Sequence, residues 1–277
     1  DKSQVYDERY FKHDYVFLND EYTGITGIKR DYWVAAIFLF LLSSLITIGG
    51  KRGTYTSLCI LGNIALFGII IYMNMRGVDI LYMTIAGTVV FTFFVLLVVD
   101  GLSHRMMLSF AAALLTTLLL SSLVMLLIWH TDIDYDFLHF LPEPFTTTDA
   151  NHFFLAQIII GCLGAVIDVS VTITAACMEL IERTPSISNK SLLRSVREVA
   201  DDINGTMISV VLLTNIASTL PIFLISMSNE ISFRTVVSHD AYFYIVRSLT
   251  GMLSIVVAIL VSTFITSLVA RKELKHD

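Results

Sequence analysis

Residues Phe153–Met178 read FFLAQIIIGCLGAVIDVSVTITAACM, an apolar run in which Asp168 is the only acidic or basic residue. A helix needs about 20 mostly apolar residues to cross the hydrocarbon core of a bilayer, and this run is long enough. Only 15 % of the chain is charged, whereas a soluble domain carries about 25 %. The run therefore predicts a membrane-spanning helix, and the composition predicts that lipid surrounds much of the protein.

Other apolar runs lie on both sides of this one. The complete set is Trp33–Gly49, Thr54–Met73, Ile80–Val99, Met106–Trp129, Phe153–Met178, Gly205–Met227 and Val246–Ala270. The fold class that this pattern predicts is all-α, a membrane bundle of about seven transmembrane helices. We expect residues 33–270 to form the transmembrane domain, between an N-terminal segment of residues 1–32 and a C-terminal tail of residues 271–277.

Basic residues predict the orientation of this bundle, because lysine and arginine favour cytoplasmic loops. The loop of residues 131–152 holds five acidic residues and no lysine or arginine. Basic segments alternate with such basic-poor ones and contain Lys51–Arg52, His104–Arg105, Arg183, Lys190, Arg194, Arg197 and the tail residues Arg271, Lys272 and Lys275. The pattern predicts an N-terminus outside and a C-terminus in the cytoplasm. Residues 1–32 would then be an extracellular segment, either a short exported tail or the remnant of a larger domain with an upstream anchor.

The segment of about residues 190–204 differs from the other loops. Its apolar residues recur at near-helical spacing, and charged residues stand between them. This pattern predicts a cytoplasmic amphipathic helix lying along the inner membrane face. An ordinary solvated connector helix is the alternative. The residues predicted for this cytoplasmic face, including the end of the fifth run, are Glu179, Arg194, Arg197 and Asp202.

Asp168 is an ionisable residue inside the fifth apolar run, and its position there needs a physical explanation. It lies 11 residues before Glu179, which is about 16 Å along a helix and close to the bilayer midplane. Asp at a helix centre costs about 2.5–3.5 kcal/mol on insertion scales, so the side chain must face protein or water. Gly161, Gly164 and Thr172 share its helix face. Asp168 is then either a proton- or cation-coupling site or a neutral side chain that hydrogen-bonds a neighbouring helix.

The last two runs supply polar and small residues that could pack against this face. Asn215 lies near the middle of the sixth run with Ser218 one turn on, and Asn215 could donate a hydrogen bond to Asp168 or join helices as structural glue. Gly251 and Ser254 lie on a face of small residues in the seventh run, which fits close helix packing. Arg247 opens that run, and we expect its side chain to snorkel to water.

Several function classes find no support in the chain. The net charge of −6 argues against a nucleic-acid partner, which needs a clustered basic face. There is no Walker loop, HExxH or GxSxG motif, so we expect no enzyme, no cofactor and no metal. Cys59, Cys162 and Cys177 lie in apolar runs and are interpreted as packing residues.

Read together, several motifs resemble the YibE/F family of bacterial multi-pass membrane proteins, over about residues 33–270. They are GGKRG at Gly49–Gly53, GCLGAVIDVSVTI at Gly161–Ile173, MEL at Met178–Leu180, DINGTM at Asp202–Met207, STLP at Ser218–Pro221 and RSLTG at Arg247–Gly251. The resemblance implies a plasma-membrane protein of Gram-positive-type bacteria, often paired with a homologue, and transfers no settled activity. Here Asp201 stands where the family pattern has arginine, and Ser209–Val210 replace an Asn-Thr pair.

A fold-level analogy extends to SecD and SecF of the RND superfamily, although four runs precede the Asp-bearing one here, two more than in an RND half. We therefore expect a transport or export component in which Asp168 titrates, with Thr172 and Asn215 as partners. It would work in the bilayer as a homo-oligomer or with a paired homologous subunit. The alternative is a non-transporting scaffold that anchors an extracellular domain and binds another envelope protein. An intramembrane enzyme would need a nucleophile that the runs do not offer, and the sequence identifies no substrate.

Overall fold

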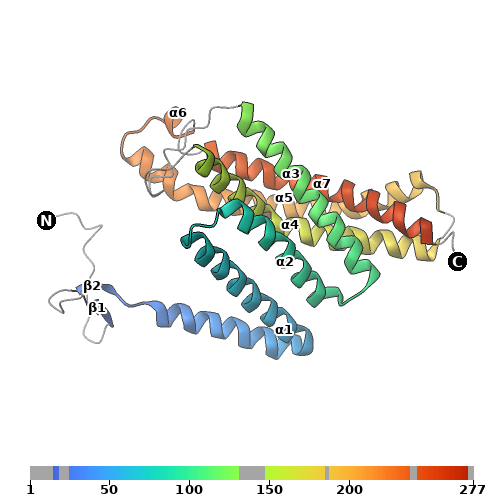
Figure 1. Cartoon of the computed structure of the whole chain (residues 1–277), viewed down its shortest axis with the longest axis horizontal. Coiled ribbons are helices and arrows are strands. Elements are labelled where there is room, and N and C mark those ends of the chain that lie inside the picture. The colour runs from blue at the N-terminus through green and yellow to red at the C-terminus, as the bar shows by residue number, and fades with distance from the viewer. Residues whose placement is uncertain (1–14, 19–24, 131–146, 185–186, 238–241, 274–277) are drawn as a thin grey trace. The chain divides into compact units, whose positions relative to one another are not determined.

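The computed structural model describes residues 15–18, 25–130, 147–184, 187–237 and 242–273, so the remainder of the N-terminal segment, most of the acidic loop and the last four residues lie outside the described parts. Figure 1 shows the order of elements. They are β1 (Val16–Leu18), β2 (Ile25–Ile28), α1 (Asp31–Met75), α2 (Ile80–Asp100), α3 (His104–His130), α4 (Thr147–Arg183), α5 (Asn189–Ser228), α6 (Phe233–Thr235) and α7 (Tyr242–Glu273).

The long helices account for all the predicted apolar runs. In the described residues, six helices are long and apolar enough to cross a membrane, namely α1 to α5 and α7. The all-α membrane fold is therefore confirmed. The chain divides into two compact units, one up to Leu61 and the other from Gly62 onward.

The first unit contains a small sheet that the sequence analysis did not predict. β1 and β2 pair antiparallel, with Val16 opposite Ile28. The backbone N–H of Lys29 donates to the carbonyl of Tyr15 at 2.7 Å, and the ring of Tyr15 meets Tyr32 edge-on at 5.9 Å between centroids. These contacts attach the sheet to the first turn of α1.

The helix α1 is two helical arms joined at Gly50. This residue has φ 54° and ψ −128°, which is non-helical and close to the first central position of a type II′ turn. Only glycine adopts such a conformation without strain. The arms on either side correspond to the predicted runs Trp33–Gly49 and Thr54–Met73. Gly50 therefore ends the first run at the position that the sequence indicates.

The two arms approach each other closely at Gly53. A Cβ placed on Gly53 would lie 1.8 Å from the carbonyl oxygen of Leu45. Eight residues of straight helix would separate these positions by about 12 Å, so the contact requires the chain to reverse at Gly50. Ser57, one turn after Gly53, is also buried. The glycine at residue 53 lets the backbones of the two arms touch.

The second unit is a helical bundle with α4 at its centre, and Figure 1 shows α2, α3, α4, α5 and α7 side by side. The most apolar part of α4 is 61 % buried, compared with 6 % for α5. The core is made of aliphatic side chains from these helices, among them Leu96, Val166, Ile173 and Ile255, all fully buried. Helix α4, which carries Asp168, therefore contacts all the other long helices of this bundle, α2, α3, α5 and α7.

Two contacts fix the register between α4 and α7. A Cβ on Gly161 would lie 3.8 Å from Cδ of Arg247, and the thiol of Cys177 lies within hydrogen-bonding distance of Thr263. Both pairs are separated by the same 86 residues along the chain, so the two helices run parallel with a constant offset. Asp168 therefore lies at the level of Ser254.

Residues 190–204 form the first turns of α5 and continue without a break into the sixth apolar run. The hydroxyl of Ser188 caps this helix by accepting from the N–H of Ser191 at 3.1 Å. Leu192, Val196 and Ala200 are buried in the main core of the bundle. The apolar face of the predicted amphipathic segment is therefore occupied within the chain.

Candidate functional site

The side of α4 that faces away from the core carries the predicted polar site. Gly161, Gly164, Asp168 and Thr172 are all exposed there. The hydroxyl of Thr172 donates to the backbone carbonyl of Asp168 at 2.8 Å, so it does not bind the carboxyl group. Across the described ranges, no side chain lies within hydrogen-bonding or ion-pairing distance of the Asp168 carboxyl. Asp168 therefore lies at the outer surface of the bundle, with its carboxyl group partly covered by its neighbours.

Arg247 occupies a junction of α4, α5 and α7. Its Nε donates to Oδ1 of Asn215 at 3.0 Å, and its guanidinium lies 5.4 Å from the ring centroid of Tyr244. Its Cδ faces Gly161, where the missing side chain leaves room. The side chain therefore turns toward α5 and is half-buried, with contacts to Asn215 and Tyr244 that the expected snorkelling did not include.

The structure does not bring Asn215 and Asp168 together. The Oδ1 of Asn215 accepts from Arg247, and its Nδ2 donates to the carbonyl of Val211 at 2.8 Å. Asp168 lies seven residues beyond Gly161 on α4, which is about 10 Å deeper than the Arg247 junction. Ser218 is exposed and donates to the carbonyl of Thr214 at 2.8 Å. The polar groups thus form two separate sites at two depths.

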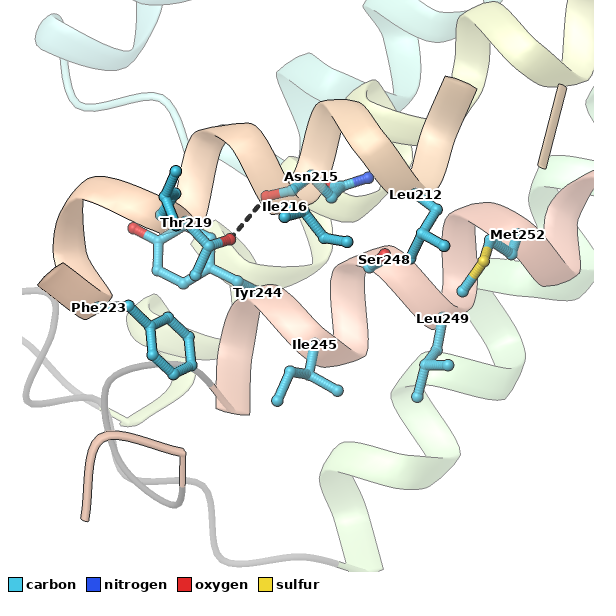
Figure 2. A pocket seen from close by; sticks show the side chains of 11 residues that line it. Leu212, Asn215, Ile216, Thr219, Phe223, Tyr244, Ile245, Ser248, Leu249 and Met252 are labelled. Atoms are coloured by element: carbon cyan, nitrogen blue, oxygen red, sulfur yellow. Dashed lines mark hydrogen bonds between the residues drawn. The ribbon is translucent and has the colours of Figure 1, made fainter. Parts of the chain in front are cut away.

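A groove lies between α5 and α7 beside the Arg247 junction, as Figure 2 shows. It has a volume of about 230 Å³. Its few polar groups include Asn215 and Thr219, and the hydroxyl of Thr219 donates to the backbone carbonyl of Asn215 at 2.7 Å, the dashed line in Figure 2. The other lining residues are Leu212, Ile216, Leu220, Phe223, Tyr244, Ile245, Ser248, Leu249 and Met252. The groove is therefore an apolar channel with one polar edge.

The small residues of α7 pack as predicted for a close helix contact. A Cβ on Gly251 would lie 3.1 Å from Cγ1 of Val211, so α5 approaches α7 at this level. Ser254 and Ala258 are fully buried, and the hydroxyl of Ser254 donates to the Gly251 carbonyl at 2.6 Å. This contact forms next to the groove residues Leu212 and Met252.

The residues predicted for the cytoplasmic face are all exposed. Glu179 pairs with Arg183 at 2.6 Å across one helical turn, and such an exposed pair contributes little to stability. Arg194, Arg197 and Asp202 lie on the exposed side of α5. These residues form a charged surface where α4 ends and α5 begins.

A second polar cluster, which the sequence did not predict, lies at the other end of the bundle. Oδ2 of Asp79 lies 2.5 Å from Nδ1 of His152, while its Oδ1 accepts from the N–H of Leu81 at 2.7 Å and so caps α2. The pair lines a cavity of about 260 Å³ together with Asn74. Asp79 directly precedes an apolar run, which signals a helix cap, but its partner is 73 residues away in the chain.

We expect Asp79→Ala to lower the free energy of unfolding by about 1–2 kcal/mol, because it removes both the cap and the histidine contact. Asp79→Asn keeps an oxygen for the cap and should lose only the part that depends on His152. Thermal unfolding can be followed by maleimide labelling of the buried thiols of Cys162 and Cys177. Asp79→Asn can also be measured in a His152→Ala background. If it lowered the free energy of unfolding by the same amount there as in the wild type, the contact between Asp79 and His152 would not contribute to stability.

No group of three potential metal ligands is present within the described ranges. What the residues define is a bundle of long apolar helices with isolated polar groups inside and outside, which is the construction of an integral membrane protein. The chain belongs to the YibE/F-like protein family, which it matches over residues 36–272. This match confirms the resemblance that the sequence motifs indicated. Searches of curated proteins and of solved structures found no match.

Proposed function

We propose that this chain is a transport or export component of the bacterial plasma membrane, in which Asp168 takes up and releases a proton near the bilayer midplane. The observation that carries the proposal is the exposure of the Asp168 carboxyl on the outer side of the central helix, without a partner in the described residues. A charged carboxyl in contact with lipid is costly. The group can ionise only when water or another protein reaches it, which is the property that a coupling site needs.

The proposed topology has seven crossings, with the N-terminus outside and the C-terminus in the cytoplasm. The two arms of α1 count as two crossings, and α2, α3, α4, α5 and α7 supply the others. Lys51 and Arg52 are exposed at the turn between the arms, where the preference of basic residues for the cytoplasm supports the orientation.

A second copy of the chain or a paired homologous subunit would cover the exposed face of α4. Among the described residues, nothing lies within 4 Å of the place where a Cβ on Gly164 would stand. Glycines on a membrane helix let a second helix approach closely. The covering subunit would then control when the Asp168 carboxyl meets water.

Unpaired hydroxyl groups inside the bundle support transport rather than a purely structural role. Within the described residues, ten buried serine and threonine hydroxyls have no hydrogen-bond partner: those of Thr84, Thr88, Thr92, Ser109, Thr116, Ser170, Thr174, Ser248, Ser262 and Thr266. Each such group costs about 1–3 kcal/mol. A scaffold gains nothing from that cost, whereas a protein that passes polar solutes uses polar groups in its interior.

The alternative of a membrane scaffold has less support. It relied on the amphipathic segment of residues 190–204 as a docking surface for another envelope protein. The apolar side of that segment, with Leu192 and Val196, is buried in the core of the chain itself. The side that remains accessible carries Arg194 and Arg197, with Leu193 exposed between charged residues.

Carbodiimide labelling in nanodiscs from pH 5 to pH 9, read by peptide mass spectrometry, tests the proposal. Carbodiimides react with protonated carboxyl groups in apolar surroundings, so labelling of Asp168 should fall through one midpoint as the pH rises. Asp168→Asn should abolish the labelled peptide, and Glu179→Gln, which alters an exposed carboxyl at the helix end, should leave it unchanged. Absence of labelling at every pH would refute the proposal that Asp168 titrates, and the scaffold function would then be the better-supported hypothesis.

A further inference from the structure

The guanidinium of Arg247 has no counter-ion within the chain as described. Its contacts are the hydrogen bond from Nε to Asn215 and the ring of Tyr244, and no carboxylate of the described residues lies within 4.0 Å. Arginine carries five N–H donors, and only the one on Nε is used here. The N–H groups of the two terminal nitrogens therefore remain available to an acceptor.

The depth of Arg247 follows from the proposed midplane position of Asp168. Arg247 lies beside Gly161 on α4, about 10 Å along the helix from Asp168. Because half of the hydrocarbon core is about 15 Å thick, Arg247 would then lie about 5 Å inside the edge of the core, on the side of the N-terminal end of α7. The guanidinium would thus lie just below the level of the lipid phosphate groups.

The groove between α5 and α7 extends to both sides of the Arg247 level: Leu212 and Met252 lie on the side of the bilayer centre, and Phe223 lies toward the N-terminal end of α7. Asn215 and Tyr244, which contact the guanidinium, also line the groove, and Figure 2 shows the lining side chains running from Tyr244 to Met252 on α7. Ile216, Leu220, Ile245 and Leu249 are exposed on the outer surface of the bundle. The groove is open to lipid along its length.

We propose that this groove binds one anionic phospholipid of the leaflet that adjoins the N-terminal end of α7. The lipid phosphate would accept hydrogen bonds from the terminal nitrogens of Arg247, which suit the geometry of phosphate oxygens. Asn215 holds the guanidinium in place through its Oδ1. One acyl chain would lie between α5 and α7 against the apolar walls. This site is independent of the proposed titration of Asp168.

Native mass spectrometry of the protein released from nanodiscs tests this proposal, with phosphatidylglycerol and phosphatidylcholine of identical acyl chains as the probes. The wild-type protein should retain one phosphatidylglycerol in preference to phosphatidylcholine. Arg247→Gln should reduce that preference about fivefold to tenfold, and Arg247→Lys should reduce it less. Arg234→Gln, which changes an exposed arginine of α6, is the matched control and should leave the preference intact.

A second variant tests the groove while keeping the charge. Leu249→Trp fills the channel and should lower retention of both lipids, whereas its unfolding midpoint, followed through the buried cysteines, reports whether the bundle is intact. Equal retention of the two lipids by the wild type, or an unchanged preference in Arg247→Gln, would overturn the proposal. Full retention in a folded Leu249→Trp variant would overturn the assignment of the acyl chain to the groove.

Discussion

Replacing Gly53 with alanine is expected to loosen the helical hairpin of α1 and to accelerate amide exchange in residues 39–61 by about 10- to 100-fold. The new Cβ would lie 1.8 Å from the carbonyl oxygen of Leu45. The obstacle is backbone, so no side-chain rotation can relieve it and the two arms must separate. Overpacking of this kind costs about 1–3 kcal/mol, and each 1.4 kcal/mol changes an opening equilibrium about tenfold.

Gly49→Ala is the matched control for this substitution. Nothing lies within 4 Å of its added Cβ, and alanine favours a helix over glycine by about 0.5–1 kcal/mol, so exchange should stay the same or slow slightly. Hydrogen–deuterium exchange with mass spectrometry in nanodiscs measures both variants, with peptides of α4 as the internal reference. If the two variants exchanged alike, the arms of α1 would not be in contact at Gly53.

The sequence predicted each long helix because the signals for such helices are local. Runs of about 20 apolar residues identified every long helix. Gly50 interrupts α1 directly after the predicted end of the first run. The sheet of β1 and β2 was missed because strands of three and four residues are too short to show an alternating pattern. Residues 190–204 were recognised as helical, but periodicity cannot tell whether a helix continues straight into the next segment.

The sequence predicted which residues of the candidate site share one face of a helix, but not which residues of other helices they contact. Helical spacing placed Gly161, Gly164, Asp168 and Thr172 together, and all four are exposed on α4. The partner of Asn215 depends on how α5 and α7 are offset, and that offset depends on packing such as the contact of Gly251 with Val211 rather than on any local pattern. For the same reason, the inward turn of Arg247 could not be foreseen from its place near a helix start.

A variant in which Thr92, Thr116, Thr174 and Thr266 are replaced together by valine is expected to be more stable than the wild type by about 4 kcal/mol or more. All four hydroxyls are fully buried and have no hydrogen-bond partner in the described structure. Valine has the same shape as threonine without the polar atom, and each unpaired group costs about 1–3 kcal/mol. The midpoint of thermal unfolding, read from labelling of Cys162 and Cys177, should rise by about 10 °C.

The control variant is Thr117→Val. This threonine is also buried, but its hydroxyl donates to the carbonyl of Ala113 at 2.9 Å. Its replacement should therefore change stability little.

Higher stability of the variant with all four valines would mean that the wild-type hydroxyls lower the stability of the protein. Such a cost is expected where function requires the groups. Under the proposed transport role, transport should then fall in the same variant. A loss of stability would mean instead that water molecules satisfy these hydroxyls, because valine would remove the partners of that water. The interior of the bundle would then be wet in the resting protein, and a route for protons through it would not depend on Asp168 alone.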